Sequence, residues 1–296
     1  MATVFYDKAS VSVDWGTAGE TLLASDFTVN LSSSAQPLYA IGYKGSLGQF
    51  PTSARVGDVS FNFITSITGV NYGQKGNLIN FLASGIKHSV GSMASGVTIS
   101  GAGVKGIGFL NSYSFNVASN SISTSSASFT FFGSGSQLPV SGRLTDSTAT
   151  VGIGTTAGSS LATGVAHGRY TPLTTLKTTI GAGDDPDPTD EGTVFGADYS
   201  VNFNHNPIYK MGQEFPVMSL YTTAQESINV TEDIFQSGLA FDESSNDYTI
   251  DLHGLDTAST NDKMQLKMIS GKQVSTSMSA GLDDIVRSQK TLTASY

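Results

Sequence analysis

The chain has 296 residues, no cysteine and a formal net charge of −9, and only 13% of its residues are charged. This length suits two domains of common size, and the lack of cysteine excludes disulfides, thiolate metal sites and a small disulfide-stapled scaffold. The acidic balance argues against tight binding to nucleic acid, because contacts to phosphate need Lys and Arg.

The acidic charge is placed unevenly along the chain. Residues 1–150 hold 7 Lys or Arg and 6 Asp or Glu, a balance of +1, whereas residues 151–296 hold 8 and 18, a balance of −10. Ser, Thr, Gly and Asn fill many polar positions, which suits a surface that meets other proteins over much of its area; a weakly charged monomer is the alternative. Met1–Ser10 has no basic start before an apolar run, so we expect no signal peptide. No stretch approaches the roughly 18 apolar residues of a membrane helix.

Three short segments of the first half recur in the same order in the second half. Asp26–Leu31 (Asp-Phe-Thr-Val-Asn-Leu) recurs as Asp198–Phe203 (Asp-Tyr-Ser-Val-Asn-Phe). The following pairs are Pro37-Leu38-Tyr39 with Pro207-Ile208-Tyr209, and Gly48-Gln49-Phe50-Pro51 with Gly212-Gln213-Glu214-Phe215-Pro216. Three matches in order predict a tandem of two related domains.

Alternation of apolar and polar residues extends the similarity as a pattern. Such a period of two is typical of half-buried antiparallel strands. We pair Val59, Phe61 and Phe63 with Ile228 and Val230; Tyr113, Phe115 and Val117 with Met264, Leu266 and Met268; and Ala127, Phe129 and Phe131 with Leu292, Ala294 and Tyr296. The spacing between the copies shrinks along the chain, so the first copy has a longer loop, for which Gly85–Gly108 is the candidate.

Helix signals are few. Gly76–Gly85 is predicted to be a short helix that ends at a glycine. Thr231–Phe235 is its expected counterpart, with Thr231 as the N-cap and acidic residues in the first turn.

These patterns predict an all-β fold made of two tandem, related β-sandwich or barrel domains, each with one short helix. The predicted domains are residues 1–133 and 197–296. Residues 134–196 form a Gly-, Ser- and Thr-rich connecting segment. A flexible linker of this length is uncommon in a compact protein, so part of it, around Thr174–Ile180, is expected to supply strands of the second domain.

Two segments invite a ligand interpretation. Gly101–Gly106 satisfies the pattern GxGxxG, but a dinucleotide site needs a helix directly after the glycines. Ile107–Tyr113 continues as a strand pattern instead, which favours a glycine-rich hairpin or an inter-subunit loop. The acidic run Asp184–Glu191 offers carboxylates for Ca²⁺ but lacks the spacing and central glycine of an EF-hand, so a solvated, exposed loop is the main alternative.

No residue stands out as catalytic, cofactor-binding or metal-ligating. His88, His167, His205 and His253 are far apart and none has a second ligand at close spacing, so we expect no zinc site. No serine lies in a GxSxG elbow. We therefore predict that the chain is not an enzyme and has no cofactor.

The recurring Gly-Gln-Phe-Pro element has two interpretations. One is a structural turn, in which Phe50 anchors the loop and Pro51 stiffens it. The other is a contact loop that is placed equivalently twice in an assembly.

Taken together, the paired Asp26–Leu31 and Asp198–Phe203 strands, the paired Pro-x-Tyr and Gln-Phe-Pro elements and the Ser- and Thr-rich strands resemble the tail tube (major tail) proteins of long-tailed bacteriophages. The resemblance is to the type in which the tube domain is duplicated within one chain, and it covers most of the sequence.

This resemblance implies that three chains form a ring of six domains and that the rings stack into a tube. It implies other tail proteins as partners, such as the terminator, tape measure, baseplate or sheath, and genomic DNA that passes through the lumen without specific binding. The expected location is the virion tail, assembled in the cytoplasm of the bacterial host, with no membrane partner. Acidic residues of 197–284 are expected to line the lumen together with Ser, Thr and Asn.

Two other classes remain open. The first is a different virion component, such as a tail terminator, a distal-tail ring or a capsid decoration protein. The second is a glycan-binding or depolymerising fibre protein, although Trp15 is the only tryptophan available for an aromatic platform.

Overall fold

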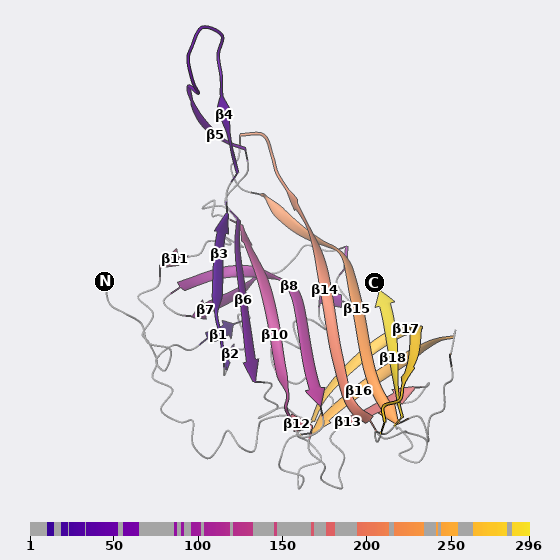
Figure 1. The fold of residues 1–296 in the computed structure, drawn as a ribbon. Helices are drawn as coiled ribbons and strands as arrows, with labels where there is room; N and C mark the ends of the chain where they lie inside the picture. The colour runs from indigo at the N-terminus through magenta and orange to yellow at the C-terminus, as the bar shows by residue number, and fades with distance from the viewer. Residues whose placement is uncertain are drawn as a thin grey trace.

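Strands make up almost all of the structure, a computed structural model that describes residues 11–14, 19–22, 24–32, 34–52, 56–64, 86–87, 90–91, 96–101, 104–118, 121–132, 145–146, 167–168, 176–180, 194–212, 216–233, 241, 244–253, 263–282 and 286–296. The strands are β1 (Val11–Asp14), β2 (Gly19–Leu22), β3 (Thr28–Ser32), β4 (Ala35–Leu38), β5 (Gly48–Pro51), β6 (Val56–Ile64), β7 (Val97–Gly101), β8 (Val104–Ala118), β9 (Ser121–Ile122), β10 (Thr124–Phe132), β11 (Thr145–Asp146), β12 (His167–Gly168), β13 (Leu176–Ile180), β14 (Val194–Ile208), β15 (Met218–Asp233), β16 (Ser245–His253), β17 (Lys263–Ser279) and β18 (Arg287–Ser295). The predicted all-β class is confirmed (Figure 1).

One antiparallel sheet runs through both halves of the chain. Its order is β3-β6-β10-β8 in the first half, followed directly by β14-β15-β18-β17-β16-β13 in the second. The halves meet where residues 112–118 of β8 pair with residues 196–202 of β14. The join is therefore a continuous hydrogen-bonded ladder.

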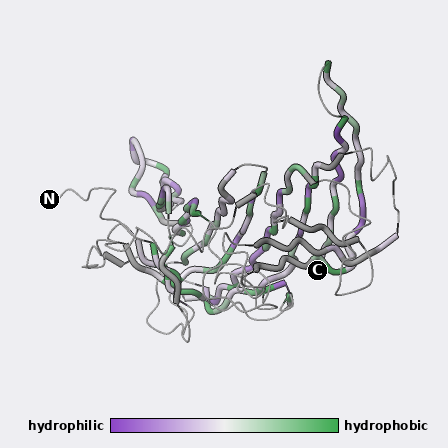
Figure 2. The backbone as a smooth tube through the Cα atoms, turned by 90° about the horizontal axis from the view of Figure 1, so that it is seen from below, coloured by the Kyte–Doolittle hydropathy of each residue, from purple (hydrophilic) through white to green (hydrophobic). Residues whose placement is uncertain are grey.

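The predicted alternation decides which side of each strand is buried. In β6, Val59, Phe61 and Phe63 are buried whereas Ser60 and Asn62 are exposed. The same period of two appears along many strands as alternating hydrophobic and hydrophilic residues (Figure 2). Because successive side chains of a strand point to opposite faces, the sheet has one apolar and one polar face.

The apolar face carries a core cluster that includes residues of both halves. Phe61 stacks on Phe129 with ring centroids 5.9 Å apart, and Tyr113 of β8 meets Tyr199 of β14 at 6.3 Å. The second contact lies at the join, so the core continues from one half into the other.

Two long strands pass from the main sheet into a second layer that crosses it (Figure 1). Residues 104–108 of β8 pair with β7, and residues 109–116 pair with β10. Residues 263–272 of β17 pair with β16, and residues 272–279 pair with β18.

A glycine stands at each of these transitions. A Cβ atom on Gly108 would lie 2.8 Å from Phe131, and one on Gly271 would lie 2.5 Å from the sulfur of Met268. Both strands thus place a residue without a side chain where the chain passes close to the core.

Two local predictions can be compared with the structure. The Gly101–Gly106 segment belongs to the antiparallel β7–β8 pair, with Gly101 opposite Val104, as the hairpin interpretation expected. The predicted helix at Thr231–Phe235 is wrong for its first three residues, because Thr231–Asp233 ends β15 and pairs with Arg287–Gln289 of β18.

Other predictions fall mainly outside the described residues. The helix predicted at Gly76–Gly85 lies there, and the next two residues, Ile86 and Lys87, are helical. The acidic run Asp184–Glu191 also lies outside. Near Thr174–Ile180 the expected strand is present as β13, which pairs with β16.

Candidate assembly surfaces

The first candidate surface is a hairpin arm that projects from the body of the protein (Figure 1). It consists of β4, β5 and their connection, residues 39–47, and we call it arm 1. Gly42 and Gly45 have φ angles of +93° and +102°, which favour glycine over any residue with a side chain. The tip therefore turns tightly while its neighbours remain in solvent.

The side chains of arm 1 are largely apolar and exposed. The exposed large hydrophobic residues are Leu38, Tyr39, Ile41, Tyr43, Leu47 and Phe50. The exposed fraction of Phe50 is 65%, so Phe50 does not anchor a turn on its own chain, as the first interpretation had it; its counterpart Phe215 lies outside the described residues.

A second arm is formed by the end of β14, the start of β15 and the turn between them, and we call it arm 2. The backbone of Ile208 accepts a hydrogen bond from Val217 at 2.8 Å, just as Leu38 accepts one from Leu47 at 2.7 Å in arm 1. Its turn contains Gly212 with a φ of +80°. Ile208, Tyr209, Met211 and Met218 are exposed. The repeated Pro-x-Tyr segments thus lie at corresponding places on two apolar arms.

Large exposed apolar groups concentrated in this way mark interaction sites on soluble proteins. A third set lies at the hairpin between β17 and β18, where Val274, Met278 and Leu282 are exposed.

Two of the open edges that the sheet has in the described part of the chain lie on β3 and β17. β3 ends the strand order on one side. On the other side, residues 273–279 of β17 pair with β18, whereas β16 pairs only as far as residue 272. Unpaired strand edges readily pair with another chain.

Burial along β3 differs from burial along β14. Phe27 and Val29 are only partly buried at the open edge. Tyr199 and Val201, which stand at the corresponding places in the repeated segment, are fully buried at the join with β8. The open edge therefore leaves apolar surface that a neighbouring strand would cover.

The polar face of the sheet is held together by side-chain hydrogen bonds between adjacent strands. Ser112 and Ser114 of β8 meet Ser128 and Ser126 of β10, each pair at 2.7 Å. Farther along, Asn204 donates to Thr223 at 2.7 Å.

The join between the halves has such a bond as well. Asn116 of β8 donates to the carboxylate of Asp198 on β14. Side chains that bond one another in this way present a smooth hydroxyl and amide surface.

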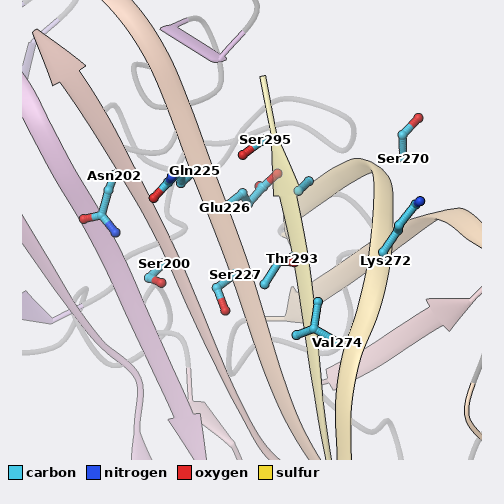
Figure 3. A pocket seen from close by; sticks show the side chains of 11 residues that line it. Ser200, Asn202, Gln225, Glu226, Ser227, Ser270, Lys272, Val274, Thr293 and Ser295 are labelled. Atoms are coloured by element: carbon cyan, nitrogen blue, oxygen red, sulfur yellow. The ribbon is translucent and has the colours of Figure 1, made fainter. Parts of the chain in front are cut away.

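A groove of about 580 Å³ lies on this face in the second half. It is formed by four neighbouring strands, β14, β15, β18 and β17 (Figure 3). Its lining is mostly Ser, Thr, Asn and Gln, with Lys272 at one side, and Glu226 also borders it. This groove belongs mainly to the polar face and offers hydrogen-bonding groups.

A buried ion pair connects the two halves behind the sheet. The Lys87 Nζ and Glu226 Oε1 atoms are 2.6 Å apart, and both side chains are almost wholly buried. Lys87 also lies 3.4 Å from the Tyr199 hydroxyl, and the Tyr296 hydroxyl donates to Glu226 at 2.7 Å. Burial, followed by the charge of Glu226, raises the pKa of Tyr199 well above 10.0, so this phenol stays protonated.

No sequence pattern had singled out Lys87 or Glu226. Lys87 comes from the connection between β6 and β7, and Glu226 from β15, 139 positions later in the chain. Glu226 is buried and paired with Lys87, so it is an exception to the expectation that acidic residues of 197–284 line a channel. Asp198 is exposed on the polar face, and for the other acidic residues the expectation stays a prediction.

None of the four histidines was expected to bind zinc, and His205 is the one whose side chain the structure describes. It has a structural role. Its Nε2 atom lies 2.9 Å from the backbone oxygen of Leu110, and its ring lies 4.5 Å from that of Tyr221. Burial lowers its pKa from 6.5, so the neutral imidazole donates this hydrogen bond. Within the described ranges, no group of three or more His, Asp or Glu side chains could hold a metal ion.

Helices long and apolar enough to cross a membrane are not found among the residues with described structure. Comparison with family models gives no match to this chain, and comparison with curated proteins gives no similar sequence.

Proposed function

We propose that this chain is a structural virion protein that builds the tail tube of a long-tailed bacteriophage. Three chains close a ring of six related β domains, and rings stack into a tube through which genomic DNA passes. The protein acts by assembly and not as an enzyme. The observation that supports this proposal is the repeated strand order. Strands β8 and β14 are joined in the middle of the sheet, and their counterparts β17 and β3 each have an open edge.

The two halves correspond strand by strand. The order β3-β6-β10-β8 is matched by β14-β15-β18-β17. Asp26 accepts hydrogen bonds from Asn62 of the neighbouring strand, and Asp198 stands opposite Asn229. Tandem duplication accounts for both the sequence repeats and these registers.

The registers also extend the correspondence to the last strands. Ala127 is opposite Phe61, and Leu292 is opposite Ile228. Ala127 pairs on its other side with Tyr113, and Leu292 with Gln273. Tyr113 therefore corresponds to Gln273, so its pairing with Met264 in the sequence comparison is wrong; residue 264 pairs with β16 instead.

The join inside the chain is a template for a join between chains. β8 meets β14 within one chain, and β17 and β3 are their counterparts at the open edges. Ser114 is opposite Ser200 in the internal join. The corresponding pair between chains is Ser275 opposite Thr28.

A contact between unlike surfaces generates a closed ring when its rotation closes. Repetition of the β17–β3 join therefore makes a ring in which the open edges of β17 and β3 are paired and Phe27 and Val29 are covered. Three chains, each with two halves, give the pseudo-sixfold ring.

The polar face supplies the channel lining. Its bonded Ser, Thr and Asn side chains offer little positive charge to hold phosphate. Asp198 adds an acidic group at the join. DNA slides along such a surface without being retained.

The arms supply the contact between rings. Both arms carry exposed Pro-x-Tyr segments and apolar tips, Ile41 in arm 1 and Met211 in arm 2. Two arms per chain give six contacts per ring of three chains, which matches the pseudo-sixfold symmetry.

Electron microscopy of the concentrated protein in negative stain tests the function directly. Stacked hollow rings, with a mass of three chains per ring by light scattering, are expected. Single closed rings that never stack would favour a terminator or distal-tail role, and a persistent monomer would refute the assembly proposal.

Cysteine cross-linking tests the ring junction, because the chain has no cysteine of its own. A Thr28→Cys/Ser275→Cys variant should form covalently linked trimers on mild oxidation, since opposite residues of antiparallel strands lie within the reach of a disulfide. Ser114→Cys/Ser200→Cys should link only within one chain. Ser32→Cys/Ser275→Cys is the off-register control, and equal cross-linking in it would show that the proposed register is wrong.

A further inference from the structure

The two arms and the turn between β17 and β18 lie at opposite ends of the main sheet. Arm 2 leads into Met218, the first residue of β15, and arm 1 lies at the same end (Figure 1). From Met218, β15 runs for 16 residues, about 50 Å of strand, to Asp233. Asp233 pairs with Arg287, the first residue of β18, so the turn before Arg287 lies at the far end.

The start of this turn is exposed and uncharged. We call residues 278–282, with the sequence Met-Ser-Ala-Gly-Leu, the basal turn. All five residues are exposed, and the exposed fraction of Leu282 is 98%. Met278 and Leu282 are large apolar side chains in solvent, so burial against another apolar surface would be favourable.

The corresponding turn of the first half, between β8 and β10, differs in its chemistry. It lies at the same end of the sheet, since Thr124 at the start of β10 pairs with Ile64 at the end of β6. Those of its residues whose side chains the structure describes are small or polar, namely Ala118, Ser121, Ser123 and Thr124. Among the described side chains at this end, the exposed large apolar ones therefore belong to the second half.

The arms also differ from each other, although their Pro-x-Tyr segments correspond. Tyr39 of arm 1 is 69% exposed, whereas its counterpart Tyr209 of arm 2 is 47% exposed. Every residue from 34 to 50 is exposed in arm 1, but Pro216 at the base of arm 2 is buried. Arm 1 therefore offers the larger apolar surface to another molecule.

We propose that arm 1 of one copy packs against the basal turn of a copy in the next ring. The contact joins Ile41 and Tyr43 of the arm to Met278 and Leu282 of the turn, all exposed in the single chain. Because the two surfaces are unlike and lie at opposite ends of the molecule, the contact repeats from ring to ring and extends the stack. This inference rests on the proposed stack of rings.

The contact also determines how successive rings are rotated. Arm 1 belongs to the first half and the basal turn to the second half, so each first half lies in line with a second half of the next ring. A stack with like halves in line would place the basal turn against arm 2, which has less exposed apolar surface. Unlike halves in line therefore bury the most apolar area.

Cysteine cross-linking distinguishes the two alignments, because the chain has no cysteine of its own. In stacks treated with a short bismaleimide, the full-length variant Ala40→Cys/Ala280→Cys should form links between chains. Lys210→Cys/Ala280→Cys is the matched control, since Lys210 follows Tyr209 as Ala40 follows Tyr39. The first variant should give at least about ten times more links, because burial of one more large apolar side chain favours a contact by at least that factor.

The single variant Ala280→Cys tests whether two basal turns meet instead. Links in this variant, or equal yields in the two double variants, would overturn the inference. So would stacks that form without links in Ala40→Cys/Ala280→Cys, and that result would leave the proposed function standing. Absence of both rings and stacks in the unsubstituted protein would refute the proposed function and this contact with it.

A substitution in the basal turn gives a second measurement. Leu282→Ser should leave folding and the ring cross-links of Thr28→Cys/Ser275→Cys unchanged, because Leu282 is exposed, and should lower the mean mass of the stacks in light scattering. Ser279→Ala, at an exposed neighbouring position, is the control and should stack normally. Stacks of unchanged mass in Leu282→Ser would overturn the contact.

Discussion

Removal of Glu226 should destabilise the protein far more than an ordinary single substitution. In Glu226→Val, the Lys87 ammonium stays buried without the carboxylate that lies 2.6 Å from it, and the Tyr199 hydroxyl 3.4 Å away is neutral. Removal of one partner of a buried ion pair lowers the free energy of unfolding by about 3–5 kcal/mol. The Tyr296 hydroxyl also loses an acceptor, which adds about 1 kcal/mol.

The double variant Lys87→Met/Glu226→Val should recover most of this loss, because replacement of a buried ion pair by apolar groups of similar volume is often neutral or stabilising. The expected coupling free energy is therefore about 3 kcal/mol or more. Urea unfolding followed by circular dichroism measures it, at a protein concentration where light scattering shows a monomer.

Gln225→Val is the matched control, since Gln225 neighbours Glu226 on the same strand but is exposed. It should change the free energy of unfolding by no more than about 0.5 kcal/mol. Additive effects of the two single substitutions, or a loss under about 1 kcal/mol for Glu226→Val, would refute the assignment of a buried, coupled pair.

Three further predictions concern other parts of the fold. Gly108→Ala should lower the free energy of unfolding by about 1–3 kcal/mol, because the new Cβ would lie 2.8 Å from the Phe131 ring. Gly48→Ala is the control, since Gly48 has open space around it and the substitution should be neutral. Equal urea midpoints for the two variants would contradict this prediction. Met211→Ser should leave the thermal midpoint of the monomer unchanged, because the Met211 side chain is fully exposed. It should shorten the stacks of rings measured by light scattering. Stacks of unchanged length would exclude arm 2 as a contact between rings. Because burial lowers the pKa of His205, the unfolded chain binds the proton more tightly, so stability is full above about pH 6.5 and declines as the pH falls from there toward the folded-state pKa. His205→Gln, which keeps a neutral donor, should flatten this decline in thermal midpoint, and an unchanged pH profile would show that His205 does not contribute to it.

The sequence predicted the strands well where apolar residues alternate over many positions. In β6 and β10, the apolar residues of the pattern, such as Phe61 and Phe129, are the ones buried. This prediction needs no knowledge of neighbours, since a period of two places alternate side chains on one face whatever the strand pairs with.

Prediction failed where a distant strand overruled a local signal. Thr231 followed by two acidic residues is a good helix N-terminus in isolation. In the structure these residues extend β15, where Thr231 pairs with Gln289 of β18. A short stretch of sequence gives no indication that its residues pair with a strand nearly sixty positions away.

The exposure of the arms was also beyond local prediction. Phe50 next to a proline is equally compatible with an anchored turn and an exposed contact, and only the projection of β4 and β5 away from the sheet distinguishes them (Figure 1).

The sequence by itself determined the all-β class, the buried face of long alternating strands such as β6 and β10, and the repetition of segments. These properties depend on residue type and short-range period. Only the tertiary structure decided that β8 pairs with β14, that β3 and β17 have open edges, and that Lys87 meets Glu226. Backbone hydrogen bonds between strands are the same for nearly all residues, so the order of strands depends on how the whole set of apolar faces packs together and not on any one segment.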